Sequence, residues 1–210
     1  MIFSVIQTGK EAFDADFTIT RHNTQIGYVK VREWSLARTG IIKGKLSDTV
    51  FEMKRNADLL NVVSPHDPQN KYSIQIHDQI CGNIYHDSFK KGIFHSYTFD
   101  RMELKGQDFR RYGIGLGKDG NCSPIYFGER QIAQFTKDSE IINECYNFHC
   151  AALDEHSGLI ALLFCCYSYI TTCYKPGQTM SKSVRKSFSK TTNKYELQYY
   201  NPRFLDQVED

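Results

Sequence analysis

Strong net charge is missing from this sequence, and so are two common sequence signatures. The 26 Lys and Arg residues nearly balance 24 Asp and Glu, for a formal net charge of +2. A strong overall field that draws in nucleic acid is not expected, so we predict no specific nucleic-acid partner. The seven cysteines are odd in number and include no Cys-x-x-Cys pair. Residues 1–7 lack the basic start and the apolar run of a signal peptide. Together these features predict a reducing cytoplasm, with a peripheral position at the inner membrane surface as the alternative.

What the sequence does contain is an ordinary globular composition that is rich in aromatic residues. The 210 residues are 40% apolar and 24% charged, which fits one domain with or without a tail. Aromatic residues make up 13%, mostly Tyr and Phe, and these residues favour pleated, half-buried surfaces. The composition therefore favours a chain built mainly of strands.

Short strands separated by turns are predicted over residues 13–146. Residues 72–77 alternate between apolar and polar with a period of two. Turn residues separate the predicted strands, for example at His22-Asn23 and Lys105-Gly106. Many short strands at this spacing predict a sandwich or a barrel.

The most apolar segment lies near the C-terminus, where no charged residue occurs between His156 and Lys175. A helix over about residues 158–174 would be apolar on every face, so it must be buried in a core or in a membrane. About 17 residues rise roughly 26 Å, slightly less than the thickness of a bilayer core. Ser168 and Thr171 weaken it further as a membrane span. We therefore predict a buried core helix, and a membrane anchor is the alternative.

The last segment, residues 175–210, is first basic and then aromatic. The aromatic part is able to pack back on the domain, whereas the basic part is expected to be mobile. We predict a domain over residues 1–174 followed by a partly mobile tail.

The order of these elements resembles a known superfamily. The resemblance rests on the sequence order of several short motifs that are followed by the apolar helix. These motifs are Tyr72-Ser73-Ile74, Gly82-Asn83-Ile84-Tyr85, Pro124-Ile125-Tyr126-Phe127-Gly128, Gln131-Ile132-Ala133 and Leu153-Asp154. The arrangement is similar to the tubby C-terminal-domain-like superfamily, which includes tubby-like proteins, phospholipid scramblases, the plant LURP-one-related proteins and small bacterial members, the last being the closest. The resemblance implies a β-rich (α+β) fold, a closed antiparallel β-barrel of about twelve strands around a central hydrophobic C-terminal helix. Closure would remove exposed sheet edges.

The same resemblance implies a binding role, because relatives bind phosphoinositides or have been linked to lipid scrambling or transcription. Lys30 and Arg32 are two residues apart on a predicted strand, so both side chains share one face. A pair of this kind can clamp a phosphorylated headgroup, and tubby-like phosphoinositide sites use one. Further candidates for a basic patch at loop ends are Lys90, Lys91, Arg110 and Arg111.

Catalytic, metal and cofactor motifs are not recognised. The glycine-rich stretch over residues 113–120 leads into another predicted strand, whereas a dinucleotide fingerprint must open a helix. Lys118 is followed by Asp119, so there is no P-loop. On a strand, His149 and Cys150 would point to opposite faces. We predict no catalytic residue, no metal and no cofactor; whether His77, Asp78, His86 and Asp87 converge stays open.

Three classes of function remain. The leading hypothesis is a non-catalytic binding module that recognises anionic phospholipid headgroups or a protein partner at the barrel surface. The second is a membrane-anchored, scramblase-like protein whose helix enters the bilayer. The third is a cryptic enzyme that uses Cys or His residues in a cleft, which would require a convergent cluster of such residues in a pocket.

Overall fold

Strands make up most of the molecule. The computed structural model describes residues 1–11, 13–34, 39–55, 71–91, 95–116, 120–138, 140–141, 145–173, 186–187 and 194–208. Its strands are β1 (Ile2–Lys10), β2 (Asp14–Arg21), β3 (Thr24–Trp34), β4 (Thr39–Leu46), β5 (Thr49–Arg55), β6 (Tyr72–Ile76), β7 (Gln79–Lys91), β8 (His95–Leu104), β9 (Gln107–Arg111), β10 (Ile114–Gly115), β11 (Asn121–Phe127), β12 (Arg130–Lys137), β13 (Glu140–Ile141), β14 (Asn147–Ala152) and β15 (Lys186–Ser187).

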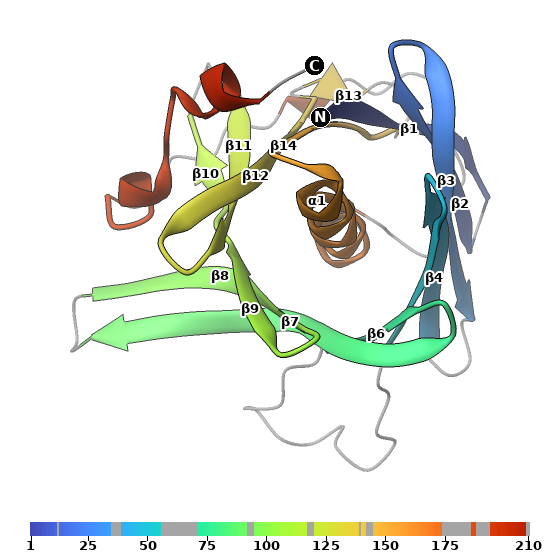
Figure 1. Ribbon diagram of the computed structural model, residues 1–210, viewed down its shortest axis with the longest axis horizontal. Helices are drawn as coiled ribbons and strands as arrows, with labels where there is room; N and C mark the ends of the chain where they lie inside the picture. The colour runs from blue at the N-terminus through green and yellow to red at the C-terminus, as the bar shows by residue number, and fades with distance from the viewer. Residues whose placement is uncertain are drawn as a thin grey trace.

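Twelve of these strands close into an antiparallel barrel, the architecture that the resemblance implies. The order around the ring is β11-β12-β14-β1-β2-β3-β4-β5-β6-β7-β8-β9, and β9 pairs with β11 again to close it. β10 is an extra strand beside β11, and β13 pairs with β15 in a separate two-stranded sheet. Figure 1 shows the ring nearly end-on. Closure leaves the twelve strands paired on both sides along at least part of their length.

Side chains alternate between the lumen and the outside along the barrel strands. In β2, for example, Ala15, Phe17 and Ile19 are buried while the residues between them are partly exposed. This period of two sends one apolar row from each strand into a shared core. The core thus lies inside the ring, where it meets the helix.

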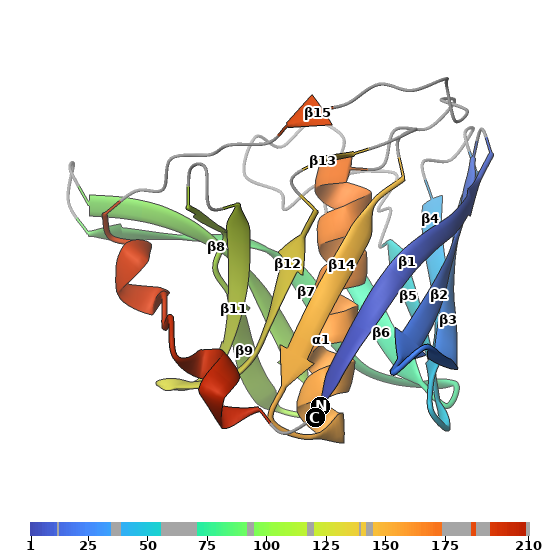
Figure 2. The same ribbon diagram turned by 90° about the horizontal axis from the view of Figure 1, so that it is seen from above.

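A single long helix fills the lumen. α1 (Glu155–Ser168) begins after Asp154, whose carboxylate accepts a hydrogen bond of 2.7 Å from the Ser157 amide. The helix continues as a π-helical turn, η2 (Tyr169–Cys173). Every residue from 157 to 168 is buried, so no helix face meets solvent. In Figures 1 and 2 the ring surrounds α1, which lies along the inner face of β12 and β14.

The predicted core helix is therefore confirmed, with changed ends. It begins three residues earlier than residue 158, and its last described residue is Cys173. By length and composition alone Glu155–Cys173 is apolar enough to cross a membrane, but 78% of its most apolar stretch is buried inside the protein. The predicted end at Tyr174 lies outside the described residues.

The aromatic end of the C-terminal segment packs on the outside of the barrel. Residues 194–208 include two short 3-10 turns, η3 (Leu197–Tyr199) and η4 (Phe204–Gln207). The Tyr199 ring stacks on Tyr112 of the loop after β9, with centroids 3.7 Å apart and planes 4° from parallel. The Tyr126 hydroxyl donates a 3.0 Å hydrogen bond to the Tyr199 carbonyl oxygen. Most of the basic half, residues 175–193, lies outside the described residues, so its predicted mobility stays a prediction.

Candidate ligand-binding cavity

Two neighbouring strands of the barrel wall, β8 and β10, are not paired with each other. β8 and β9 pair from Leu104 opposite Gln107 to Asp100 opposite Arg111. Beyond Arg111 the chain leaves β8, and β10 pairs with β11 instead. Residues 95–99 of β8 continue beside β7 without β9 on their other side. The separation opens a side entrance to the lumen.

A cavity of about 480 Å³ lies at this entrance. Thr98 and Asp100 line it from β8, and Asn121 and Ser123 line it from β11. The helical segment lines its inner side with Tyr167, Ser168, Thr171 and Thr172. Pockets for small organic molecules in proteins have volumes of about 300–1,000 Å³ and combine apolar walls with a few polar groups. The cavity therefore has the size and the mixed lining of a small-molecule site.

A buried ion pair forms the wall of the cavity where β8 and β9 separate. The Arg111 guanidinium binds the Asp100 carboxylate through Nη2 and donates from Nη1 to the Ser123 hydroxyl at 3.2 Å. The Arg111 side chain is 14% exposed and the Asp100 side chain is 4% exposed. His86 completes the cluster with an Nδ1–Oδ1 distance of 2.9 Å to Asp100.

The surroundings of Asp100 keep its carboxyl group ionised. Burial alone would raise its pKa, but the Arg111 charge and the hydrogen bonds from His86 and Arg111 outweigh burial and lower the pKa below 3.8. A buried ion pair is costly to break, because either partner left alone is an uncompensated buried charge. The pair thus fixes the guanidinium at the cavity wall.

A second acidic residue reaches the cavity from the C-terminal segment. Glu196 is only 6% exposed and lines the cavity together with the Asp100–Arg111 pair. Among the described residues its carboxylate has no hydrogen-bond or ion-pair partner. Lys137 also lines the cavity, and its ammonium group contacts Cys173 Sγ at 3.6 Å. The cavity therefore contains charged groups of both signs.

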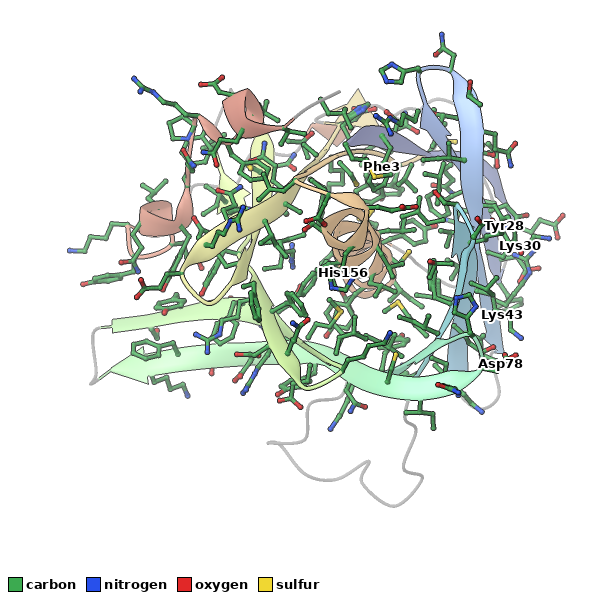
Figure 3. All side chains as sticks on the ribbon, in the orientation of Figure 1. Phe3, Tyr28, Lys30, Lys43, Asp78 and His156 are labelled. Carbon is green, nitrogen blue, oxygen red and sulfur yellow. The ribbon has the colours of Figure 1, made fainter. Side chains whose placement is uncertain are left out.

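Lys30 and Arg32 do share the outer face of β3, as the spacing predicts. Arg32 is already neutralised there, with Nη2 2.9 Å from Asp16 and Nε 3.5 Å from Asp14. Lys30 lies opposite Lys43 of β4, and its ammonium is 5.8 Å from the Tyr28 ring centroid. Figure 3 shows Tyr28, Lys30 and Lys43 pointing away from the lumen.

The other predicted basic residues do not join them in one patch. Lys90 is exposed on β7, and the side chain of Lys91 lies outside the described part of the chain. Arg110 points outward, is 46% exposed and pairs with Asp108 at 3.1 Å. Arg111 points inward, so the two arginines serve opposite faces of β9. Of the five predicted residues whose side chains the structure describes, only Arg111 lines the cavity.

The candidate catalytic residues are separated in space. His149 points outward and lies 2.9 Å from Asp138, whereas Cys150 is 1% exposed in the core. Burial raises the pKa of the Cys165 and Cys166 thiols, which makes them poor nucleophiles. His86 approaches Asp100, and within the described residues no hydroxyl or thiol is hydrogen-bonded to its ring. In the same part of the chain no group of three or more His, Cys, Asp or Glu side chains is arranged to hold a metal ion.

The fold and cavity define a closed antiparallel β-barrel with an apolar helix in its lumen and a side entrance. A scan against protein-family models, a search of curated proteins and a search of solved structures each found no match to this chain. The geometry of the cavity and the chemistry of its lining are therefore the basis for a functional proposal.

Proposed function

We propose that this protein is a non-catalytic binding module of the tubby-like kind that holds a small anionic ligand in the cavity between β8 and β10. The supporting observation is the buried Asp100–Arg111 pair, which presents a fixed guanidinium to a cavity of about 480 Å³. The closed barrel around an apolar helix is the architecture that the tubby-like resemblance implies.

Arg111 has the properties of an anion anchor. A guanidinium is planar and always charged, and it offers several N–H donors in a geometry that matches phosphate and carboxylate groups. Its contacts with Asp100 and Ser123 fix its orientation and leave further donors available. Because that orientation is already established, less conformational entropy is lost when an anion binds. A phospholipid headgroup and a free phosphorylated metabolite are both sources of such an anion.

The position of the helix favours this proposal over a membrane anchor. Moving α1 into a bilayer would expose the inner apolar rows of the barrel to water. At about 25 cal/mol per Å² of apolar surface, that exchange would be strongly unfavourable. We therefore expect a protein that is released from membranes without detergent.

Binding of sn-glycerol 3-phosphate, followed by two-dimensional amide NMR, tests the proposal. We expect shifts centred on the amides of Arg111 and Ser123, and at least tenfold weaker binding in Ser123→Ala, which loses an orienting contact without leaving a buried charge. The surface control is Lys30→Ala/Arg32→Ala, which should bind like wild type. Unchanged melting temperatures exclude misfolding as the cause.

Co-sedimentation with vesicles containing phosphatidylglycerol distinguishes a lipid headgroup from a free metabolite. Binding abolished by the Lys30/Arg32 double substitution and kept by Ser123→Ala would move the site to the outer face of β3. No interaction with either the free phosphate compound or the vesicles would refute the proposal and direct the search to protein partners.

A further inference from the structure

Glu196 has an environment that its own chain does not satisfy. The residue is 6% exposed, yet its carboxylate has no cationic or hydrogen-bonding partner among the described residues. A carboxylate that faces a cavity and has no cation in its own chain beside it is a favourable place for a cationic group of a ligand. The group lines the cavity, so a bound molecule is in a position to supply that cation.

Ordered contacts hold Glu196 at this place. Its carbonyl oxygen accepts a 3.0 Å hydrogen bond from the Tyr199 amide, which closes a short turn. Tyr199 in turn stacks on Tyr112 and accepts the hydrogen bond from Tyr126. The aromatic contacts thus fix the turn that carries Glu196 against the barrel wall.

The end of the helix adds to the negative character of the cavity lining. Ser168, Thr171 and Thr172 line the cavity, and they lie in the last described turns of the helical segment, whose last described residue is Cys173. The C-terminal end of a helix carries a partial negative charge and favours nearby cations. The other charged wall of the cavity carries the Asp100–Arg111 pair, in which the guanidinium offers N–H donors to an anion.

We propose that the ligand is a small zwitterion, whose anionic group binds Arg111 and whose ammonium group binds Glu196. This inference rests on the proposed function and adds the second pole of the ligand. A molecule such as O-phosphoethanolamine has both groups within a few bonds, either free or as part of a phospholipid headgroup. A compound with only one of the charges would satisfy only one side of the cavity.

Isothermal titration with three probes tests the inference. O-phosphoethanolamine carries both charges, sn-glycerol 3-phosphate only the anion and ethanolamine only the cation. We expect wild type to bind O-phosphoethanolamine at least tenfold more tightly than either single-charge probe. Glu196→Gln should remove this preference and leave the affinity for sn-glycerol 3-phosphate unchanged or improved. The matched control is Glu129→Gln, at an exposed position in the turn between β11 and β12.

The outcomes separate this inference from the function on which it rests. If sn-glycerol 3-phosphate binds as tightly as O-phosphoethanolamine and Glu196→Gln changes neither, the zwitterion is wrong and the anion site stands. If neither phosphate compound binds wild type, both proposals are wrong. Co-sedimentation with phosphatidylcholine vesicles, with and without phosphatidylethanolamine, identifies the source of the zwitterion. Pelleting that requires phosphatidylethanolamine and is weakened by Glu196→Gln assigns a lipid headgroup. Binding of free O-phosphoethanolamine without pelleting assigns a soluble metabolite.

Discussion

Alanine substitution of successive side chains on the core helix tests whether the barrel packs against the helix on all sides. Leu162, Leu163 and Phe164 are each 0% exposed and point in directions about 100° apart. On an amphipathic surface helix at least one of three such positions would face water, and its truncation would cost little. Here each alanine substitution should cost about 2–5 kcal/mol, because each removes a buried side chain and leaves a cavity.

Urea unfolding followed by circular dichroism measures these costs. With a slope of about 2 kcal/mol per M, a loss of about 3 kcal/mol lowers the unfolding midpoint by about 1.5 M. Leu205→Ala is the matched control, because this leucine is 53% exposed and its truncation should change stability by less than about 0.5 kcal/mol. If any of the three helix substitutions costs as little as the control, that side of α1 is not packed and the reasoning is refuted.

Three further predictions concern the ion pair, the tyrosine cluster and the thiols. Asp100→Asn should destabilise the protein by about 3 kcal/mol at pH 7, because it leaves the buried guanidinium unpaired. Since the pKa of Asp100 in the folded protein lies below 3.8, the stability advantage of wild type over this variant should persist above that pH and disappear as the pH falls through the folded pKa. Urea unfolding midpoints at several pH values measure this dependence. Burial and the hydrogen bond with Tyr199 raise the pKa of Tyr97 to about 12, so Tyr199→Ala should lower the pKa of Tyr97 toward 10. If an ultraviolet titration of this variant shows no additional tyrosine ionising between pH 10 and pH 12, the assigned contact is wrong. Only Cys81 and Cys145 of the seven free thiols are partly exposed, so Ellman's reagent should modify two thiols slowly in the native protein and all seven in urea. Rapid modification of Cys165 or Cys166, which lie on α1, would mean that the helix leaves the barrel.

The many short strands and the core helix were predictable because their signals are local, whereas the closed ring of about twelve strands was expected only from the resemblance. The turn predicted at His22-Asn23 has φ angles of 47° and 63°, a conformation that Asn tolerates well. The core helix is evident from a long stretch without charge. β1 was not predicted, since its inward row includes the polar Gln7 and Ile6 points outward, which obscures the period of two. Gln7 is accommodated inside because its side-chain oxygen accepts a 2.9 Å hydrogen bond from the Tyr146 amide.

The cavity was not predictable, because it depends on strand register. His86, Asp100 and Arg111 come from three strands and meet only through the pairing of β7 with β8 and of β8 with β9. A shift of one residue would send Arg111 outward and Arg110 inward. The sequence identified Arg111 as a basic candidate but could not give the face on which it lies. Glu196 had no signal at all, because its burial depends on aromatic contacts with residues at least 70 positions away.

The order of elements along the chain has a consequence for synthesis on the ribosome. β1 pairs with β14, so the ring cannot close until residue 152 has been made, and the helix that fills it follows later still, up to residue 173. Until then the apolar inner rows of twelve strands have no partner to cover them. Such nascent chains expose surface that promotes aggregation, and contacts so distant in sequence form slowly. We therefore expect newly made chains to depend on chaperones that shield apolar surface until α1 is released.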